Sequence, residues 1–143
     1  MHFVDAKSIL SAKNGMNIYR GCTHGCIYCD SRSDCYNMRH DFEDVEVKRN
    51  APELLEKALA SKRRLCMIGT GAMSDPYMHC EEKLMLTRRC LEVIDRHGFG
   101  VTVLTKSDMI LRDADLLSAV FDFFSYSHFY CPPCIEMATL YHV

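Results

Sequence analysis

Four cysteines gather in the segment 17–36, and their spacing is the clearest chemical feature of the sequence. Cys22, Cys26 and Cys29 follow the pattern C-x3-C-x2-C, and Cys35 lies six residues later. Closely spaced thiolates bind zinc and iron–sulfur clusters tightly. The close group nevertheless stops at three, whereas a closed structural metal site takes four ligands.

Two kinds of metal centre fit these residues. A zinc ion would need a fourth ligand, for which the segment offers His24, Cys35 and Asp30. An iron–sulfur cluster with three protein thiolates would instead leave one iron open to a small molecule. The spacing favours the cluster only slightly. With a cluster, we expect His24 to face backbone or solvent and Cys35 to be a packed or spare thiol.

The bulk composition sets the class of protein that carries this loop. Of the 143 residues, 48% are hydrophobic and 25% charged, as in a soluble globular domain. The net charge of −2 gives no general attraction to nucleic acid or to anionic membranes. The sequence has neither a signal-peptide pattern nor a membrane-spanning stretch, so a cytoplasmic location is expected. Nine cysteines in that reducing compartment favour metal ligation over disulfides.

The apolar pattern predicts alternating strands and helices. Strands are expected at 16–21, 65–69 and 100–105, with a weaker one at 44–48. One helix begins after Asn50 as N-cap, with Pro52 in its first turn, and a second is expected at about 81–97. A third helix follows Asp113 as its cap. This order predicts an α/β fold with right-handed βαβ units and a parallel sheet.

Three polar stretches each follow a predicted strand. They are the cysteine loop, "TGAMSDPY" at 70–77 and "TKSD" at 105–108. In parallel α/β folds, chemistry gathers at the carboxyl ends of the strands. The three loops should therefore meet on one face of the sheet.

Together these loops resemble a known family. The C-x3-C-x2-C motif with Tyr28 just before its last cysteine resembles the signature of the radical S-adenosylmethionine (radical SAM) enzymes. "YRGCTHGCIYCDSRSDCY", "GTGAMSDPY" and "VLTKS", in this order, look like the spore photoproduct lyase-related branch, whose members are often labelled DNA repair photolyase-like. The match runs from about Asn17 to Leu117.

The resemblance implies a cofactor and its ligands. Cys22, Cys26 and Cys29 would hold a 4Fe-4S cluster, with the amino and carboxylate groups of S-adenosyl-L-methionine on the fourth iron. One electron from the reduced cluster would then release methionine and a 5′-deoxyadenosyl radical, which abstracts a substrate hydrogen. An electron donor such as a flavodoxin or ferredoxin is implied. In the named relative the reaction reverses a thymine dimer in DNA, which makes DNA the candidate substrate and lyase chemistry the candidate activity.

Four further residues are implied to bind the cofactor. Tyr28 would lie against the adenine, Ser74 and Asp75 would make polar contacts, and Lys106 would be a cation for the carboxylate. Each has a simpler alternative. Tyr28 is also typical of a half-buried loop aromatic, Asp75 before Pro76 of a turn with Ser74 as its partner, and Lys106 of a solvated surface lysine. The glycines of "GTG" at 69–71 are expected to let the backbone approach the cofactor closely.

The family fold is a partial parallel (β/α) barrel of six βα units, and about three such units can be recognised in this sequence. We therefore predict an incomplete barrel in which residues 1–120 form the N-terminal part of a radical SAM core domain. Residues 121–143 form an atypical tail, non-native or truncated, with a Cys131-Pro-Pro-Cys134 pair that is not expected to be functional. The alternative function is a non-catalytic zinc- or cluster-binding module, or an inactive fragment of a radical SAM enzyme.

Overall fold

The computed structural model describes residues 1–127, and the predicted Cys131–Cys134 pair lies outside the described residues. Within this part, the strands are β1 (His2–Val4), β2 (Gly15–Met16), β3 (Tyr19–Arg20), β4 (Glu46–Lys48), β5 (Met67–Thr70) and β6 (Gly100–Val103). The helices are α1 (Ala51–Ala60), α2 (Glu81–Leu84), α3 (Leu86–Arg96) and α4 (Ala114–Ser127), with 3-10 turns at Asp30–Arg32, Asp34–Tyr36 and Asp108–Asp113. No described helix is long and apolar enough to cross a membrane.

The strands form two small sheets with parallel pairing in both. In one sheet the order is β2-β5-β6, and both pairs are parallel. In the other the order is β1-β4-β3, with β1 parallel and β3 antiparallel to β4. The predicted α/β fold with parallel strand pairing is thus confirmed, but the strands form two sheets in place of the one predicted, and β3 is antiparallel to its neighbour. Closure into a partial barrel stays a prediction.

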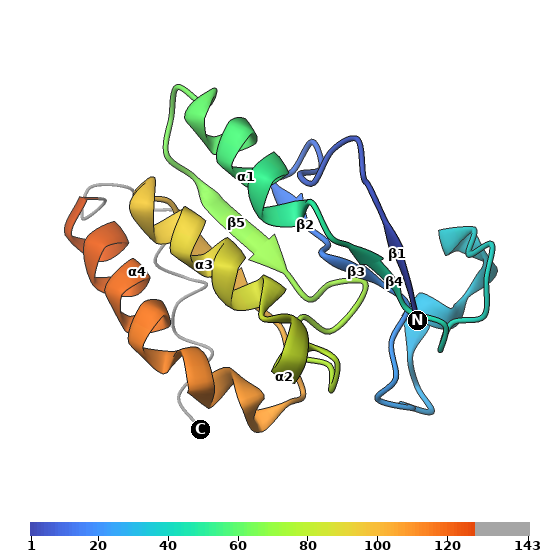
Figure 1. Cartoon of the computed structure of the whole chain (residues 1–143). Helices are drawn as coiled ribbons and strands as arrows, with labels where there is room; N and C mark the ends of the chain where they lie inside the picture. The colour runs from blue at the N-terminus through green and yellow to red at the C-terminus, as the bar shows by residue number, and fades with distance from the viewer. Residues whose placement is uncertain (128–143) are drawn as a thin grey trace.

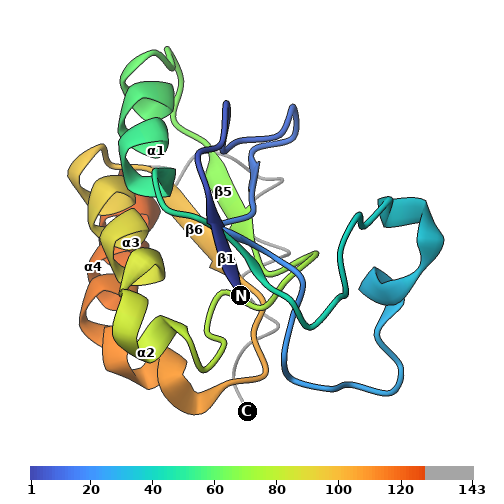
Figure 2. The same cartoon turned by 45° about the vertical axis from the view of Figure 1, so that its right-hand side comes forward.

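The helices form a layer on one side of the strands. α1 packs against α3, α3 packs against α4, and both α3 and α4 contact β6 (Figure 1). Seen from the side, the segment between β3 and β4 extends away from this helical layer (Figure 2). The cysteine loop therefore has one face that the helices do not cover.

Apolar side chains between the two layers hold the strands in place. Ile68 of β5, Leu55 of α1 and Ile94 of α3 are completely buried, as their positions in the predicted apolar patterns require. Burying one such side chain contributes about 1.5–3 kcal/mol relative to leaving it in water. The core thus fixes the strand ends from which the polar loops leave.

Several predicted boundaries change in the structure. The predicted strand at 16–21 is divided, because the chain leaves β2 after Met16 and enters β3 of the other sheet at Tyr19. β1 was not predicted. Asn50 does stand at the N-cap of α1, but its side chain makes no cap; it donates to the carbonyl of Ala6 and accepts from the amide of Ala6, both at 2.9 Å.

The predicted helix at 81–97 is interrupted by a buried carboxylate. Met85 takes a left-handed conformation with φ 54° and separates α2 from α3. The carboxylate of Glu81 accepts from the backbone amides of Leu86 and Thr87, at 3.1 and 3.0 Å, and so caps the start of α3. It also accepts from the Tyr19 hydroxyl and pairs with Arg112 at 3.1 Å.

Asp113 stands directly before α4, as predicted, but its carboxylate is used in tertiary contacts. It is fully buried and accepts from Tyr77, Arg88 and Arg112 at 2.7–3.1 Å. Burial alone would raise the pKa of Asp113, but the hydrogen bonds from Arg112 and Arg88 lower this pKa below its usual value. Asp113 and Glu81 thus anchor the 3-10 turn at Asp108–Asp113 to the start of α3.

Candidate functional site

The cysteine loop begins at a glycine that no other residue can replace without strain. Gly21 has φ +95°, and a Cβ atom there would lie 2.4 Å from the carbonyl oxygen of Phe42. That same carbonyl accepts from the amide of Cys22 at 2.9 Å. The first cysteine is therefore fixed against the chain that returns to β4.

The four cysteines differ in burial. Cys22 is buried, Cys26 and Cys29 are partly exposed, and Cys35 is exposed with its sulfur 2.8 Å from the Ser33 hydroxyl. Burial raises the pKa of the Cys22 thiol, which favours the neutral thiol until a cation compensates the thiolate charge. Cys35 is thus the most exposed of the four cysteines, and its expected role as a spare thiol stays a prediction.

The donor set of the loop fits an iron–sulfur cluster with one open iron. Cys22, Cys26 and Cys29 offer three thiols from one short loop that the helices leave uncovered (Figure 2). Thiolates are the ligands of iron–sulfur clusters, and a closed structural zinc would take a fourth ligand besides these three.

Asp75 joins the three polar loops. Its carboxylate accepts from the Thr105 hydroxyl at 2.7 Å and from the amide of Lys106 at 2.8 Å. The cysteine loop reaches the same carboxylate through His24, whose Nε2 lies 3.3 Å away without hydrogen-bond geometry. The predicted meeting of the loops is confirmed. The turn alternative also holds, because Asp75 accepts from the amide of Tyr77 two residues on.

Lys106 and Tyr28 meet at the rim of this site. The Lys106 ammonium lies 4.1 Å from the centre of the Tyr28 ring and donates to its hydroxyl. The hydrogen bond to Tyr28 raises the pKa of Lys106, and the same ammonium interacts with Cys26. Tyr28 is 75% exposed and the neighbouring Ile27 99% exposed. The structure thus brings a cation and an aromatic ring beside the second cysteine.

Two buried polar atoms in the site have no partner within the described residues. They are the Ser74 hydroxyl oxygen and His24 Nε2. Buried polar groups are nearly always hydrogen-bonded, so each such atom requires an explanation. Ser74 was predicted as a site residue. The expectation that His24 faces backbone or solvent is wrong: its side chain is only 15% exposed, and its ring lies 5.7 Å from that of His79.

The close approach predicted for the glycines at 69–71 is made to protein backbone. Gly71 has φ +96°, and a Cβ atom there would lie 1.9 Å from the carbonyl oxygen of Leu104. A Cβ atom on Gly69 would meet nothing within 4 Å. Gly71 therefore serves the contact between the ends of β5 and β6, which brings the Asp75 loop beside Thr105.

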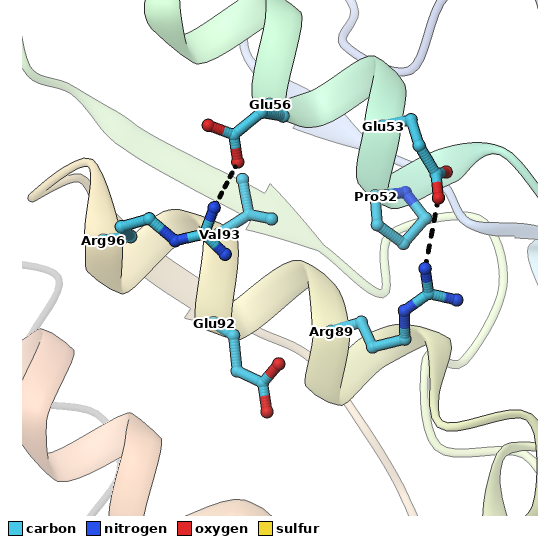
Figure 3. A pocket seen from close by; sticks show the side chains of 7 residues that line it. All are labelled: Pro52, Glu53, Glu56, Arg89, Glu92, Val93 and Arg96. Carbon is cyan, nitrogen blue, oxygen red and sulfur yellow. Dashed lines mark hydrogen bonds and ion pairs between the residues drawn. The ribbon is translucent and has the colours of Figure 1, made fainter.

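A groove elsewhere on the surface contains none of these residues. It lies between α1 and α3 and is lined by Pro52, Glu53, Glu56, Arg89, Glu92, Val93 and Arg96 (Figure 3). Two of its arginines pair across the groove, Arg89 with Glu53 at 3.1 Å and Arg96 with Glu56 at 2.9 Å. These pairs join the two helices, and the candidate site remains the junction of the polar loops.

Comparisons with known proteins show which family the sequence matches. A family model described as the radical SAM superfamily matches residues 16–128. An uncharacterized protein of Methanocaldococcus jannaschii is 36% identical over 115 residues, which cover 79% of this chain and 42% of that protein. Uncharacterized proteins of Mycobacterium bovis and Mycobacterium tuberculosis are 31% identical over 111 residues, 72% of this chain and 32% of theirs. The chain thus spans less than half the length of these relatives. No solved structure matched it.

Proposed function

The chain belongs to the radical SAM superfamily, which implies an iron–sulfur cluster and S-adenosylmethionine, and from this premise we propose their arrangement here. Cys22, Cys26 and Cys29 hold a 4Fe-4S cluster, and S-adenosylmethionine binds at its open iron. Together these groups would supply one-electron reductive cleavage of S-adenosylmethionine to methionine and a 5′-deoxyadenosyl radical. The protein binds and orients the cofactor and keeps water out.

The observation that carries this proposal is the junction at Asp75. A single carboxylate ties the loops after β5 and β6 together and lies beside the cysteine loop, so a ligand on the cysteines would also reach the other two loops. The unpartnered hydroxyl of Ser74 lies directly next to this junction in the chain. A polar ligand would satisfy it.

Each implied residue has a role that its position supports. The Lys106 ammonium pairs with the methionine carboxylate of the cofactor, and the exposed Tyr28 ring packs against the adenine. Ser74 donates to the cofactor through its buried hydroxyl. Asp75 acts by holding Lys106 and Thr105 in place.

The sharpest test is anaerobic reconstitution with iron and sulfide, followed by electron paramagnetic resonance of the reduced protein. We expect a reduced-cluster signal that changes when S-adenosylmethionine is added. Cys29→Ala should abolish the signal, and the exposed Cys35→Ala is the matched control that should keep it. One zinc per chain that is lost in Cys29→Ala, with no cluster formed, would instead establish the rival, a non-catalytic zinc module with Cys35 or His24 as fourth ligand.

We further propose that the chain belongs to the spore photoproduct lyase-related branch and shares its substrate. The basis is the order of the three motifs in the sequence. Residues 1–120 then form the N-terminal part of the core domain, a flavodoxin or ferredoxin supplies the electron, and the reaction is lyase chemistry on a thymine photoproduct in DNA. The test is incubation of the reconstituted, reduced chain with an oligonucleotide that carries the photoproduct. Loss of the photoproduct with recovery of thymine supports this assignment. Formation of 5′-deoxyadenosine with the photoproduct intact contradicts it.

A further inference from the structure

A second group of metal-ligating side chains lies where β1 meets β4. His2 of β1 and Glu46 of β4 are direct partners in the parallel register, and His40 comes from the segment that returns from the cysteine loop. One ligand atom of each side chain, a ring nitrogen from each histidine and a Glu46 oxygen, lies within 4.8 Å of the others. It is the only such group of three among the side chains that the structure describes.

The hydrogen bonds of the two rings fix which nitrogens face the carboxylate. His40 Nδ1 lies 3.0 Å from the carbonyl oxygen of Asp41, and His2 Nδ1 lies 3.0 Å from the Asp44 carboxylate. A carbonyl or an ionised carboxylate only accepts, so both Nδ1 atoms carry the hydrogen. In the neutral rings, each Nε2 then presents its lone pair.

Both Nε2 atoms lie near the same carboxylate oxygen without a hydrogen bond to it. His2 Nε2 and His40 Nε2 lie 3.9 and 4.0 Å from Glu46 Oε2, which is too long for a hydrogen bond. His40 Nε2 is buried and has no hydrogen-bond partner among the described residues. The repulsion between neutral Nε2 atoms and a carboxylate is relieved by a bound cation or by a proton on either ring, and a metal ion would satisfy all three ligand atoms together.

We propose that His2, His40 and Glu46 bind a divalent transition-metal ion such as zinc. Two imidazole nitrogens and one carboxylate are a zinc ligand set, and ligand atoms around a tetrahedral zinc lie about 3.3 Å apart. Each histidine nitrogen therefore needs to approach the Glu46 oxygen by less than about 1 Å, and the two nitrogens, which lie within 4.8 Å of each other, by at most about 1.5 Å. Asp44 and the Asp41 carbonyl hold the rings from behind, as oxygen acceptors do around metal-bound histidines. The partly exposed His2 leaves a fourth position open to water.

The ion would link the N-terminal strand to the cysteine loop. His40 lies two residues before Phe42, whose carbonyl holds Cys22. A metal on His40, His2 and Glu46 fixes this returning chain to β1 and β4. The site is formed by residues other than the proposed cluster ligands, so it stands or falls independently of the proposed function.

The test is a Co²⁺ titration of the reconstituted chain, followed by the difference absorption spectrum against the same sample without cobalt, in which the absorption of the iron–sulfur cluster cancels. Nitrogen and oxygen ligands give visible d–d bands without the sulfur-to-cobalt charge-transfer band in the near ultraviolet, which separates this site from any binding by thiolates. We expect one such ion per chain. His40→Gln and Glu46→Gln should abolish these bands, and Asp44→Asn should weaken binding roughly tenfold.

His97→Gln is the matched control. His97 also meets a glutamate, but its Nε2 lies 2.7 Å from Glu56 in an ordinary hydrogen bond. This variant should bind Co²⁺ as the parent does. Circular dichroism of each variant separates loss of the site from loss of the fold, and Zn²⁺ should raise the Tm of the parent but not of a folded His40→Gln. Absence of the nitrogen–oxygen bands in the parent, or their survival in both folded His40→Gln and Glu46→Gln, overturns the proposal.

Discussion

Two polar regions of this molecule differ in whether their buried polar groups find hydrogen-bond partners within the chain. Around Glu81 and Asp113, each buried carboxylate accepts several hydrogen bonds from within the chain. At the junction of the polar loops, the buried Ser74 hydroxyl and His24 Nε2 have no partner in the described part, and Tyr28 and Ile27 face solvent. The first region is complete without a ligand and holds the fold. In the function proposed above, the second region gains its missing contacts from the bound cofactor.

The comparison predicts that the largest loss of stability follows removal of Glu81. Glu81→Ala leaves the Tyr19 hydroxyl, two amides at the start of α3 and one face of Arg112 without their acceptor. Breaking such a buried network should lower the free energy of unfolding by about 3–5 kcal/mol, measured by urea denaturation. The exposed neighbour Glu82→Ala is the control and should change it by less than about 0.5 kcal/mol. Equal effects of the two substitutions would show that the network is not what holds α2 to α3.

Two buried hydroxyls sharpen the comparison. The Thr87 hydroxyl donates to the carbonyl of Pro76 at 2.6 Å, whereas the Ser74 hydroxyl is unpartnered. Thr87→Val should cost about 1–3 kcal/mol of stability because a buried acceptor loses its donor. Ser74→Ala should cost close to nothing, yet weaken S-adenosylmethionine binding to the reconstituted protein in equilibrium dialysis. A Ser74→Ala variant that is as destabilised as Thr87→Val, with cofactor binding intact, would remove the distinction between the regions.

The pH dependence of stability tests the Asp113 side of the comparison. The pKa of Asp113 is lowered in the folded chain, so near and below pH 4 the unfolded chain binds more protons than the folded one. The stabilisation is therefore present above about pH 4 and is lost as the pH falls through the folded pKa. In urea denaturation across pH, Asp113→Asn should be less stable at neutral pH and lose less on acidification than the parent. The exposed Asp108→Asn is the control, and its free energy of unfolding should depend on pH as that of the parent does. If the free energy of Asp113→Asn ran parallel to that of the parent across pH, Asp113 would not be the group whose pKa is lowered by folding.

The sequence predicted the parts of this architecture that local patterns encode. The apolar runs located β5 and β6, and the order of strands and loops was enough to expect that Asp75 and Lys106 would meet. The contacts that complete the two polar regions are non-local and could not be predicted. Glu81 looked like an ordinary acidic residue at a helix start, and its contact with Tyr19 spans 62 positions. His24 carried no signal beyond its place between two cysteines.

The smallest effect on stability is expected at the rim of the site. Lys106 is exposed, and its contact with the Tyr28 ring is solvated, so Lys106→Met should leave the free energy of unfolding close to that of the parent. If Lys106 pairs with the cofactor carboxylate, the same variant should bind S-adenosylmethionine about tenfold more weakly, while the cluster signal is kept. Lys83→Met, on the exposed side of α2, is the matched control.

The substitution Tyr28→Phe distinguishes the role of the Tyr28 ring from that of its hydroxyl. It keeps the aromatic ring but removes the hydroxyl to which the Lys106 ammonium donates, so the ammonium has one competitor fewer for the cofactor carboxylate. Cofactor affinity should therefore be unchanged or higher in Tyr28→Phe and lower in Tyr28→Ala, which loses the stacking surface. Equilibrium dialysis of both variants checks the order. An equal loss in both would mean that the hydroxyl, and not the ring or the freed ammonium, is what the cofactor requires.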